Sequence, residues 1–127
     1  MQTLTGTIWR VVEAFAFDAE GREIPSPIGR HPIGIVAFEE DRMIGAVADR
    51  PSPGTPSRVL ISYSGPYRFD GTELVTDAEV ASRSDLTTQQ IRSIRFESPT
   101  RMVASPKDDV LGGGSAISLS LVWELVR

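Results

Sequence analysis

The chain has 127 residues, a length that fits one domain over residues 1–127, and its 40% hydrophobic and 24% charged residues exclude disordered and collagen-like classes. Its formal net charge is -4 and its arginines are dispersed singly, which argues against nucleic acid as a partner because phosphate backbones are bound by basic surfaces. It has no cysteine, so disulfides, thiolate metal sites and thiol nucleophiles are excluded.

The first predicted element is a long strand over residues 7–18. Trp9, Val11, Phe15 and Phe17 alternate along one face of it, which is the period of a half-buried strand. Turn residues and three prolines then predict a loop that ends near His31.

Seven further strands are predicted in the rest of the chain, separated by segments rich in Gly, Pro, Ser and Asp. The Asp70-Gly71 dipeptide is a strong hairpin signal, and Gly65-Pro66 should bend the strand before it. One short helical turn is expected at residues 86–90, and the glycines at 112–114 are interpreted as a hairpin loop. The seven strands are expected at 33–39, 43–49, 59–69, 74–81, 89–97, 101–105 and 117–125.

About eight strands joined mainly by short hairpins favour an all-β, eight-stranded antiparallel up-and-down barrel, which has no exposed sheet edge. Barrels of this size can hold one small ligand. A β-sandwich would have the same number of strands, so the pattern alone leaves it open.

Short segments along nearly the whole chain resemble sequences of the bacterial lipocalin-like domain family. They include Leu4 to Val12 at the start, Tyr63 to Gly71 in the middle and Leu121 to Leu125 at the end. The resemblance implies a calycin-type barrel in which a tryptophan after an early glycine closes one end, here Trp9 after Gly6. The family spacing is one residue shorter, so we expect a bulge or shifted register between these two residues.

The candidate ligand-binding residues are those expected to point into the barrel. Glu13 and Arg92 are polar exceptions on apolar faces, where a charge is costly unless paired. We expect them to pair inside the cup. The alternative is that either side chain lies at the rim, or that the alternation is assigned to the wrong face of the strand. Tyr63 and Tyr67 should add phenol groups to the apolar wall. The full ligand-binding set is Glu13, Phe15, Tyr63, Tyr67, Arg92, Phe96 and Leu119, with Val11, Ile94 and Leu121 completing the wall.

The leading functional hypothesis is a protein that binds a small, largely apolar molecule inside the barrel. One alternative is an isomerase or cyclase that uses Glu13, Tyr63 or His31 for proton transfer, and another is a structural or interaction module with a filled interior. No catalytic motif is visible, and no cofactor or metal site is expected, since His31 is the only histidine.

The location of the protein is predicted from what its sequence lacks. The N-terminus has no basic start followed by an apolar run, and no apolar run approaches the ~20 residues of a membrane-spanning helix. We therefore expect a soluble, cytoplasmic protein without a membrane span, and a homodimer is left open.

Overall fold

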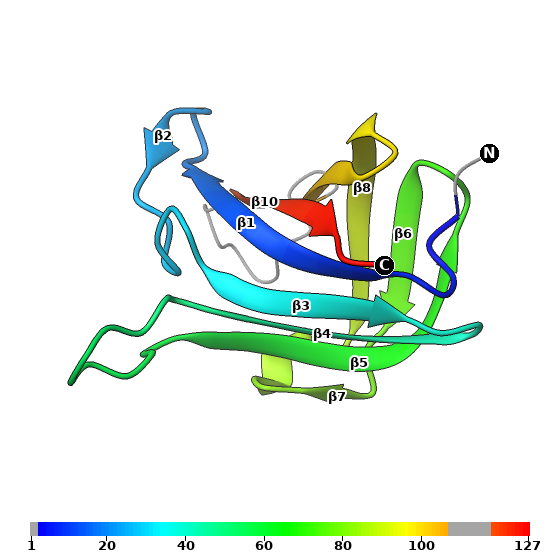
Figure 1. Ribbon diagram of the computed structural model, residues 1–127, viewed down its shortest axis with the longest axis horizontal. Helices are drawn as coiled ribbons and strands as arrows, with labels where there is room; N and C mark the ends of the chain where they lie inside the picture. Colours follow the sequence, from blue (N-terminus) through cyan, green and yellow to red (C-terminus); the bar gives the residue numbers. More distant parts are fainter. Residues whose placement is uncertain (1–2, 107–117) are drawn as a thin grey trace.

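The computed structural model describes residues 3–106 and 118–127, which are organised as β-structure with one short helical turn. Eight strands form a closed antiparallel barrel in the order β1-β3-β4-β5-β6-β8-β9-β10, and β10 pairs with β1 to close it (Figure 1). This confirms the predicted fold class and removes the sandwich alternative. The barrel strands are β1 (Ile8–Phe17), β3 (Ile33–Phe38), β4 (Arg42–Ala48), β5 (Leu60–Phe69), β6 (Glu73–Asp77), β8 (Gln89–Ser98), β9 (Arg101–Pro106) and β10 (Ser118–Leu125).

Three local predictions differ from the structure. The loop before His31 contains a short strand, β2 (Glu23–Ile24), which pairs with β1. The strand predicted at 74–81 is divided into β6 and the two-residue β7 (Val80–Ala81), and the helical turn η1 lies earlier than expected, at Ser84–Leu86. The predicted 112–114 hairpin loop lies outside the described residues.

A β-bulge at Val12 decides which side chains of β1 point inward. Val11 lies opposite Trp123 and Glu13 lies opposite Val122, so Val12 is an extra residue on β1. The bulge resets the alternation, because Val11 and Ala14 are both buried in the core. The prediction that Phe15 and Phe17 share a face with Trp9 is therefore wrong. The bulge expected between Gly6 and Trp9 is present as well: the Gly6 N–H donates to the Phe38 carbonyl over 2.9 Å, the Phe38 N–H donates to the Thr7 carbonyl over 3.0 Å, and Gly6 has a φ of 79°.

Five aromatic residues pack near one end of the barrel, where β1 begins and where the β3–β4, β5–β6 and β8–β9 hairpins turn. The ring centroids of Trp9 and Phe96 are 6.1 Å apart, and those of Phe38 and Tyr67 are 5.2 Å apart. The Tyr67 hydroxyl donates to the Glu39 carbonyl over 2.6 Å, which satisfies its polar end. We call this group the aromatic floor: Trp9, Phe38, Tyr67, Phe69 and Phe96.

Gly65 lies where β5 passes from pairing with β6 to pairing with β7. Tyr67 is opposite Thr76 but Ser64 is opposite Val80, so the partner side has one extra residue between them. A Cβ added at Gly65 would lie 2.0 Å from the Asp77 carbonyl oxygen, which is backbone and has little room to move. Because Gly65 has no side chain, the backbone of β5 can lie close to the backbone at Asp77 where β5 changes its partner strand.

Replacing Gly65 with alanine is expected to lower the free energy of unfolding by about 1–3 kcal/mol, the usual cost of forcing atoms into a packed site. Gly45→Ala on β4 is the matched control, because its Cβ would meet nothing closer than Val36 Cγ2 at 3.4 Å. Urea denaturation of both variants checks this expectation. Equal losses in the two variants would show that the contact at Gly65 has no special cost.

The side chains of Asp49 and Asp70 each hold a nearby backbone segment in place through hydrogen bonds. Asp49 Oδ1 accepts hydrogen bonds from the Val59 and Arg58 N–H groups, each over 2.8 Å. Asp70 Oδ1 accepts from the N–H groups of Glu73 and Thr72, over 2.7 and 2.9 Å. These bonds favour the ionised carboxylates and hold the pKa of both groups below the ordinary value of 3.8.

The lowered pKa values of Asp49 and Asp70 predict a loss of stability in acid. A carboxyl group whose pKa is lower in the folded state stabilises the fold above its unfolded pKa, and this stabilisation is lost as the pH falls through the folded pKa. We expect a double variant, Asp49→Ala with Asp70→Ala, to lose less stability than the parent between about pH 6 and about pH 2. Urea melts across that range measure the difference, and parallel pH profiles would contradict the assignment.

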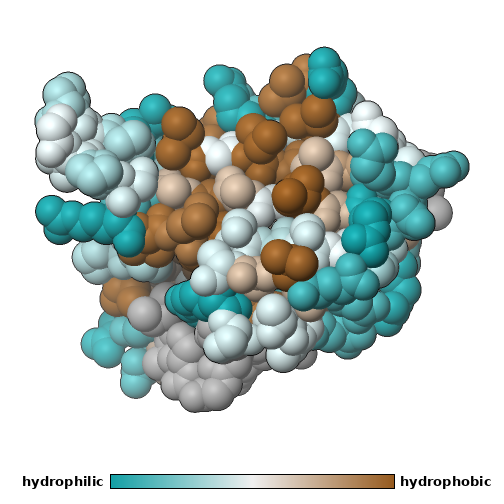
Figure 2. All heavy atoms as spheres, turned by 90° about the horizontal axis from the view of Figure 1, so that it is seen from below, coloured by the Kyte–Doolittle hydropathy of each residue, from teal (hydrophilic) through white to brown (hydrophobic). Residues whose placement is uncertain are grey.

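The outer face of β3, β4, β5 and β7 exposes branched aliphatic side chains. Figure 2 shows apolar residues gathered on this side of the molecule. Ile35, Ile44 and Leu60 are 52%, 61% and 55% exposed, and small residues such as Ala46 lie between them in the sheet register. The polar side chains of the barrel wall lie mainly elsewhere, above all across β1, β10 and β9.

Candidate functional site

The barrel contains a cavity of about 490 Å³, which is within the usual range for small-molecule sites. Most of its wall is apolar and comes from alternate residues of seven strands. The principal apolar lining residues are Val36, Phe38, Met43, Val47, Ile61, Tyr63, Leu74, Leu86, Ile94, Met102, Leu119, Leu121 and Trp123.

One side of the cavity wall is polar and comes mainly from β8 and the segment just before it. The lining residues there include Arg83, Thr88, Gln89, Gln90 and Arg92. Arg83 and Arg92 are the only charged residues among the described lining residues, and both are positive. The charge of the described wall is therefore positive, in a chain whose net charge is negative.

Gln90 fixes the position of Arg92. The Gln90 Nε2 group donates to the Leu86 carbonyl and to Thr88 Oγ1, each over 3.1 Å, and Gln90 Oε1 accepts from Arg92 Nη2 over 3.1 Å. A further bond runs from Arg92 Nη1 to the Ile91 carbonyl over 3.0 Å. The turn η1 thus holds Gln90, and Gln90 in turn orients the guanidinium of Arg92.

Several of the sequence-predicted residues lie on the cavity wall. Tyr63, Arg92 and Leu119 line it, as do Ile94 and Leu121. Gln90, Arg92 and Ile94 alternate along β8, and all three line the cavity. Gln90 was not among the predicted site residues, although its place in this alternation was the available signal.

Four other predicted residues lie away from the cavity wall. Tyr67 and Phe96 belong to the aromatic floor. Glu13 and Phe15 lie instead along a shallow outer cleft with Arg101. The Val12 bulge explains this result, because it turns both side chains to the outside of the barrel.

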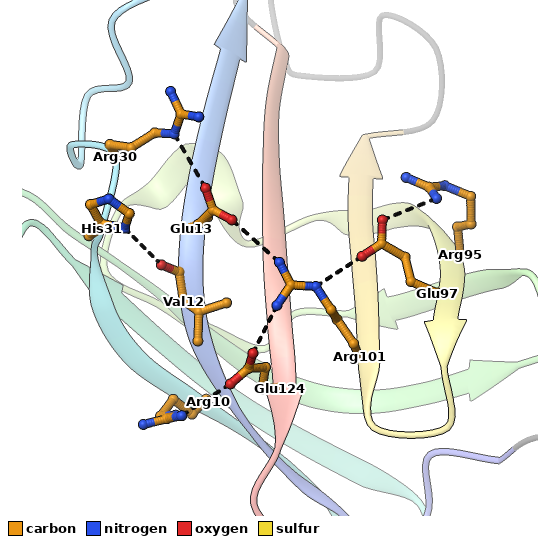
Figure 3. Close-up of polar contacts among 9 residues, drawn as sticks. All are labelled: Arg10, Val12, Glu13, Arg30, His31, Arg95, Glu97, Arg101 and Glu124. Atoms are coloured by element: carbon orange, nitrogen blue, oxygen red, sulfur yellow. Dashed lines mark hydrogen bonds and ion pairs between the residues drawn. The ribbon is translucent and has the colours of Figure 1, made fainter.

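Glu13 belongs to an ionic network across β1, β10 and β9, centred on Arg101 (Figure 3). The Arg101 guanidinium contacts Glu13 Oε1 at 3.4 Å, Glu97 Oε1 at 3.0 Å and Glu124 Oε2 at 2.8 Å. The bond to Glu97 and the charges of Glu124 and Glu13 raise the pKa of Arg101. Arg30 contacts the other oxygen of Glu13 at 3.4 Å. The predicted Glu13–Arg92 pair is therefore wrong, because Glu13 has outer partners.

Double-mutant cycles should show whether Glu13 interacts with Arg101 or with Arg92. Glu13→Gln and Arg101→Met are expected to show a coupling free energy that decreases at about 1 M salt, where the screening length is roughly 3 Å. Glu13→Gln and Arg92→Met should be additive, because they lie on opposite sides of the barrel wall. Urea melts measure both cycles, and coupling of Glu13 to Arg92 alone would show that Glu13 points inward.

The residues considered for proton transfer are not gathered in one place. Tyr63 lines the cavity, whereas Glu13 lies in the outer network. His31 is exposed, and its Nδ1 lies 3.3 Å from the Val12 carbonyl oxygen. In the described ranges, no group of three His, Cys, Asp or Glu side chains is arranged to hold a metal, and no helix is long and apolar enough to cross a membrane.

The fold and its interior define a class of protein, the closed eight-stranded antiparallel barrels with an internal, mainly apolar cavity. No protein-family model matches the chain, and no curated protein matches it. Among solved structures it is similar to a redesigned β-barrel, with 14% sequence identity over 95% of this chain and 90% of that chain, and a TM-score of 0.46.

Proposed function

We propose that this protein binds a small, largely apolar molecule inside the barrel, and that it is a lipocalin-like protein in this sense. The observation that carries the proposal is the cavity of about 490 Å³, whose wall is mainly aliphatic and aromatic with a few placed polar groups. Small-molecule sites have this composition, because apolar surface supplies binding energy and polar groups fix orientation. We propose Tyr63, Arg92 and Leu119 as ligand-contacting residues, from the predicted set.

The two alternatives have less support. A module with a filled interior would not need an open volume of this size. An isomerase or cyclase would need a proton-transferring group at the cavity, and of the three candidates only Tyr63 lines it. A binding protein requires nothing beyond the cavity and its wall.

A neutral fluorescent probe tests whether the cavity binds apolar molecules. Phenylnaphthylamine should bind to the protein with an increase in emission. In Ala104→Phe the new ring would enter the cavity, because Ala104 lines it on β9, and binding should weaken by at least about tenfold, or roughly 1.4 kcal/mol. Val103→Phe is the matched control, since the neighbouring Val103 lines the outer cleft.

Unchanged binding in Ala104→Phe, or equal weakening in both variants, would contradict binding inside the barrel. Native mass spectrometry of the purified protein adds an independent measurement. It reports the mass of any molecule that stays bound through purification, together with the number of subunits, and so also tests the homodimer.

A further inference from the structure

We propose that the ligand is a small amphipathic anion, with an apolar body against the aliphatic wall and a carboxylate-like or sulfonate-like head at Arg92. This inference rests on the proposed binding function and specifies its chemistry. It depends on the charges of the wall, on the contacts of Arg92, and on a buried hydroxyl on the neighbouring strand.

Among the residues that the structure describes, none provides a carboxylate partner for Arg92. Its two hydrogen bonds among the described residues go to neutral oxygens, those of Gln90 and the Ile91 backbone. A guanidinium has five N–H donors, so donors remain for a ligand. A positive charge in apolar surroundings is costly unless an anion or water compensates it. A bound anion would supply this compensation and accept the remaining hydrogen bonds.

The neighbours of Arg92 extend the polar site. Leu74 lies opposite Arg92 on β6, and the next inward pair along the same strands is Thr76 opposite Gln90. Thr76 is 1% exposed, and its Oγ1 is a buried atom without a hydrogen-bond partner in the described structure. Buried hydroxyls are normally satisfied, and the described residues supply no partner for this one. Thr76 is not itself a lining residue of the cavity, so its hydroxyl marks a polar position behind the wall. It lies on the strand pair that carries Arg92.

The rest of the wall defines the other end of the ligand. Ile61, Leu119 and Leu121 line the same cavity, and no negatively charged side chain is found among its described lining residues. A fully apolar ligand would leave Arg92 uncompensated, whereas a small inorganic anion would leave most of the apolar wall without contacts. An amphipathic anion would compensate the charge of Arg92 and would also contact the apolar wall.

Two probes that share an aromatic skeleton test the proposal. Anilinonaphthalene sulfonate carries one negative charge, and phenylnaphthylamine is its neutral counterpart. We expect the wild-type protein to bind the sulfonate more tightly. Arg92→Met should weaken sulfonate binding by at least about tenfold and change the neutral probe by less than about threefold, because hydrogen bonds to charged groups are the stronger ones.

Arg95→Met is the matched control. Arg95 lies on the same strand, but its side chain is 69% exposed and pairs with Glu97 on the outer network. Its removal should alter neither probe by more than about twofold if the effect at Arg92 is local, since exposed charges are well screened. If Arg92→Met does not fold in a urea melt, Arg92→Lys replaces it: this variant keeps the charge without the planar fork, and should still prefer the sulfonate.

The outcomes separate this inference from the proposed function. If neither probe binds to the wild-type protein, the binding function itself fails. If both probes bind equally, or if Arg92→Met weakens both equally, the cavity binds apolar molecules but the anion preference is wrong. Displacement of the sulfonate by decanoate more effectively than by decanol would extend the preference to carboxylates, and equal displacement by both would restrict it to the sulfonate.

Discussion

Replacing Trp9 with alanine is expected to lower the free energy of unfolding by about 3–5 kcal/mol, the usual cost of removing a large aromatic side chain from a core. Trp9 is 1% exposed, and its ring packs against Phe96 in the aromatic floor. Its Nε1 group donates to Thr7 Oγ1 over 2.8 Å, so the polar edge of the ring is satisfied as well. Truncation would leave a void at this end of the barrel and a hydroxyl without its donor.

Urea denaturation followed by circular dichroism measures the change at Trp9. Ile44→Ala is the control, because Ile44 is 61% exposed and its truncation should cost less than about 1 kcal/mol. A loss below about 1 kcal/mol in Trp9→Ala would contradict the role of the aromatic floor as the packed end of the core. A change in the slope of the free energy of unfolding against urea concentration would instead indicate a change in the surface area exposed on unfolding.

The strand order could be predicted because its signals are local. Alternating apolar residues, with Gly, Pro and Asp between them, marked all eight barrel strands to within one or two residues at most ends. Short hairpins then make consecutive strands neighbours, so the order around the barrel follows from the sequence. The closing pair, β1 with β10, is not a local signal and was inferred from the absence of free edges in barrels.

The direction of the β1 side chains could not be predicted, for a physical reason. One extra residue in a strand reverses the faces of everything after it, and Val12 differs in no visible way from its neighbours. The error therefore affected Glu13 and Phe15 and left Trp9 and Val11 correct. On β8, where Gln89 to Ser93 pair with β6 without a bulge, the same alternation argument placed Arg92 correctly.

The sequence predicts a barrel that can enclose a cavity, but it does not predict whether side chains fill that interior. Its volume depends on how far the aromatic floor extends and on how large the remaining inward side chains are. Small residues such as Gly45 and Ala104 line it and leave space that larger residues would fill. The hydrogen bond from Gln90 to the Leu86 carbonyl depends on the turn η1, whose place was predicted only approximately.

Deleting Val12 is expected to remove the bulge and leave the side chains of β1 on their present faces. Val11 already lies opposite Trp123 and Glu13 opposite Val122, so without Val12 the register between β1 and β10 is continuous. Trp9, Val11 and Ala14 then alternate inward along one regular strand, and Glu13 keeps its outward contacts with Arg101 and Arg30. The change is therefore confined to the local bend of β1 and to the Val12 carbonyl that His31 contacts.

We therefore expect the Val12 deletion to fold and to lose less than about 3 kcal/mol, within the range of ordinary single changes. Val12→Ala is the control, since it keeps the extra residue and the backbone carbonyl that His31 contacts. Its loss should stay near or below about 1.5 kcal/mol, the range for small truncations. Urea melts and near-ultraviolet circular dichroism compare the two variants. A deletion variant that fails to fold, or that loses the tertiary signal of the parent, would mean that β1 needs the bend of the bulge and not only the alternation of its side chains.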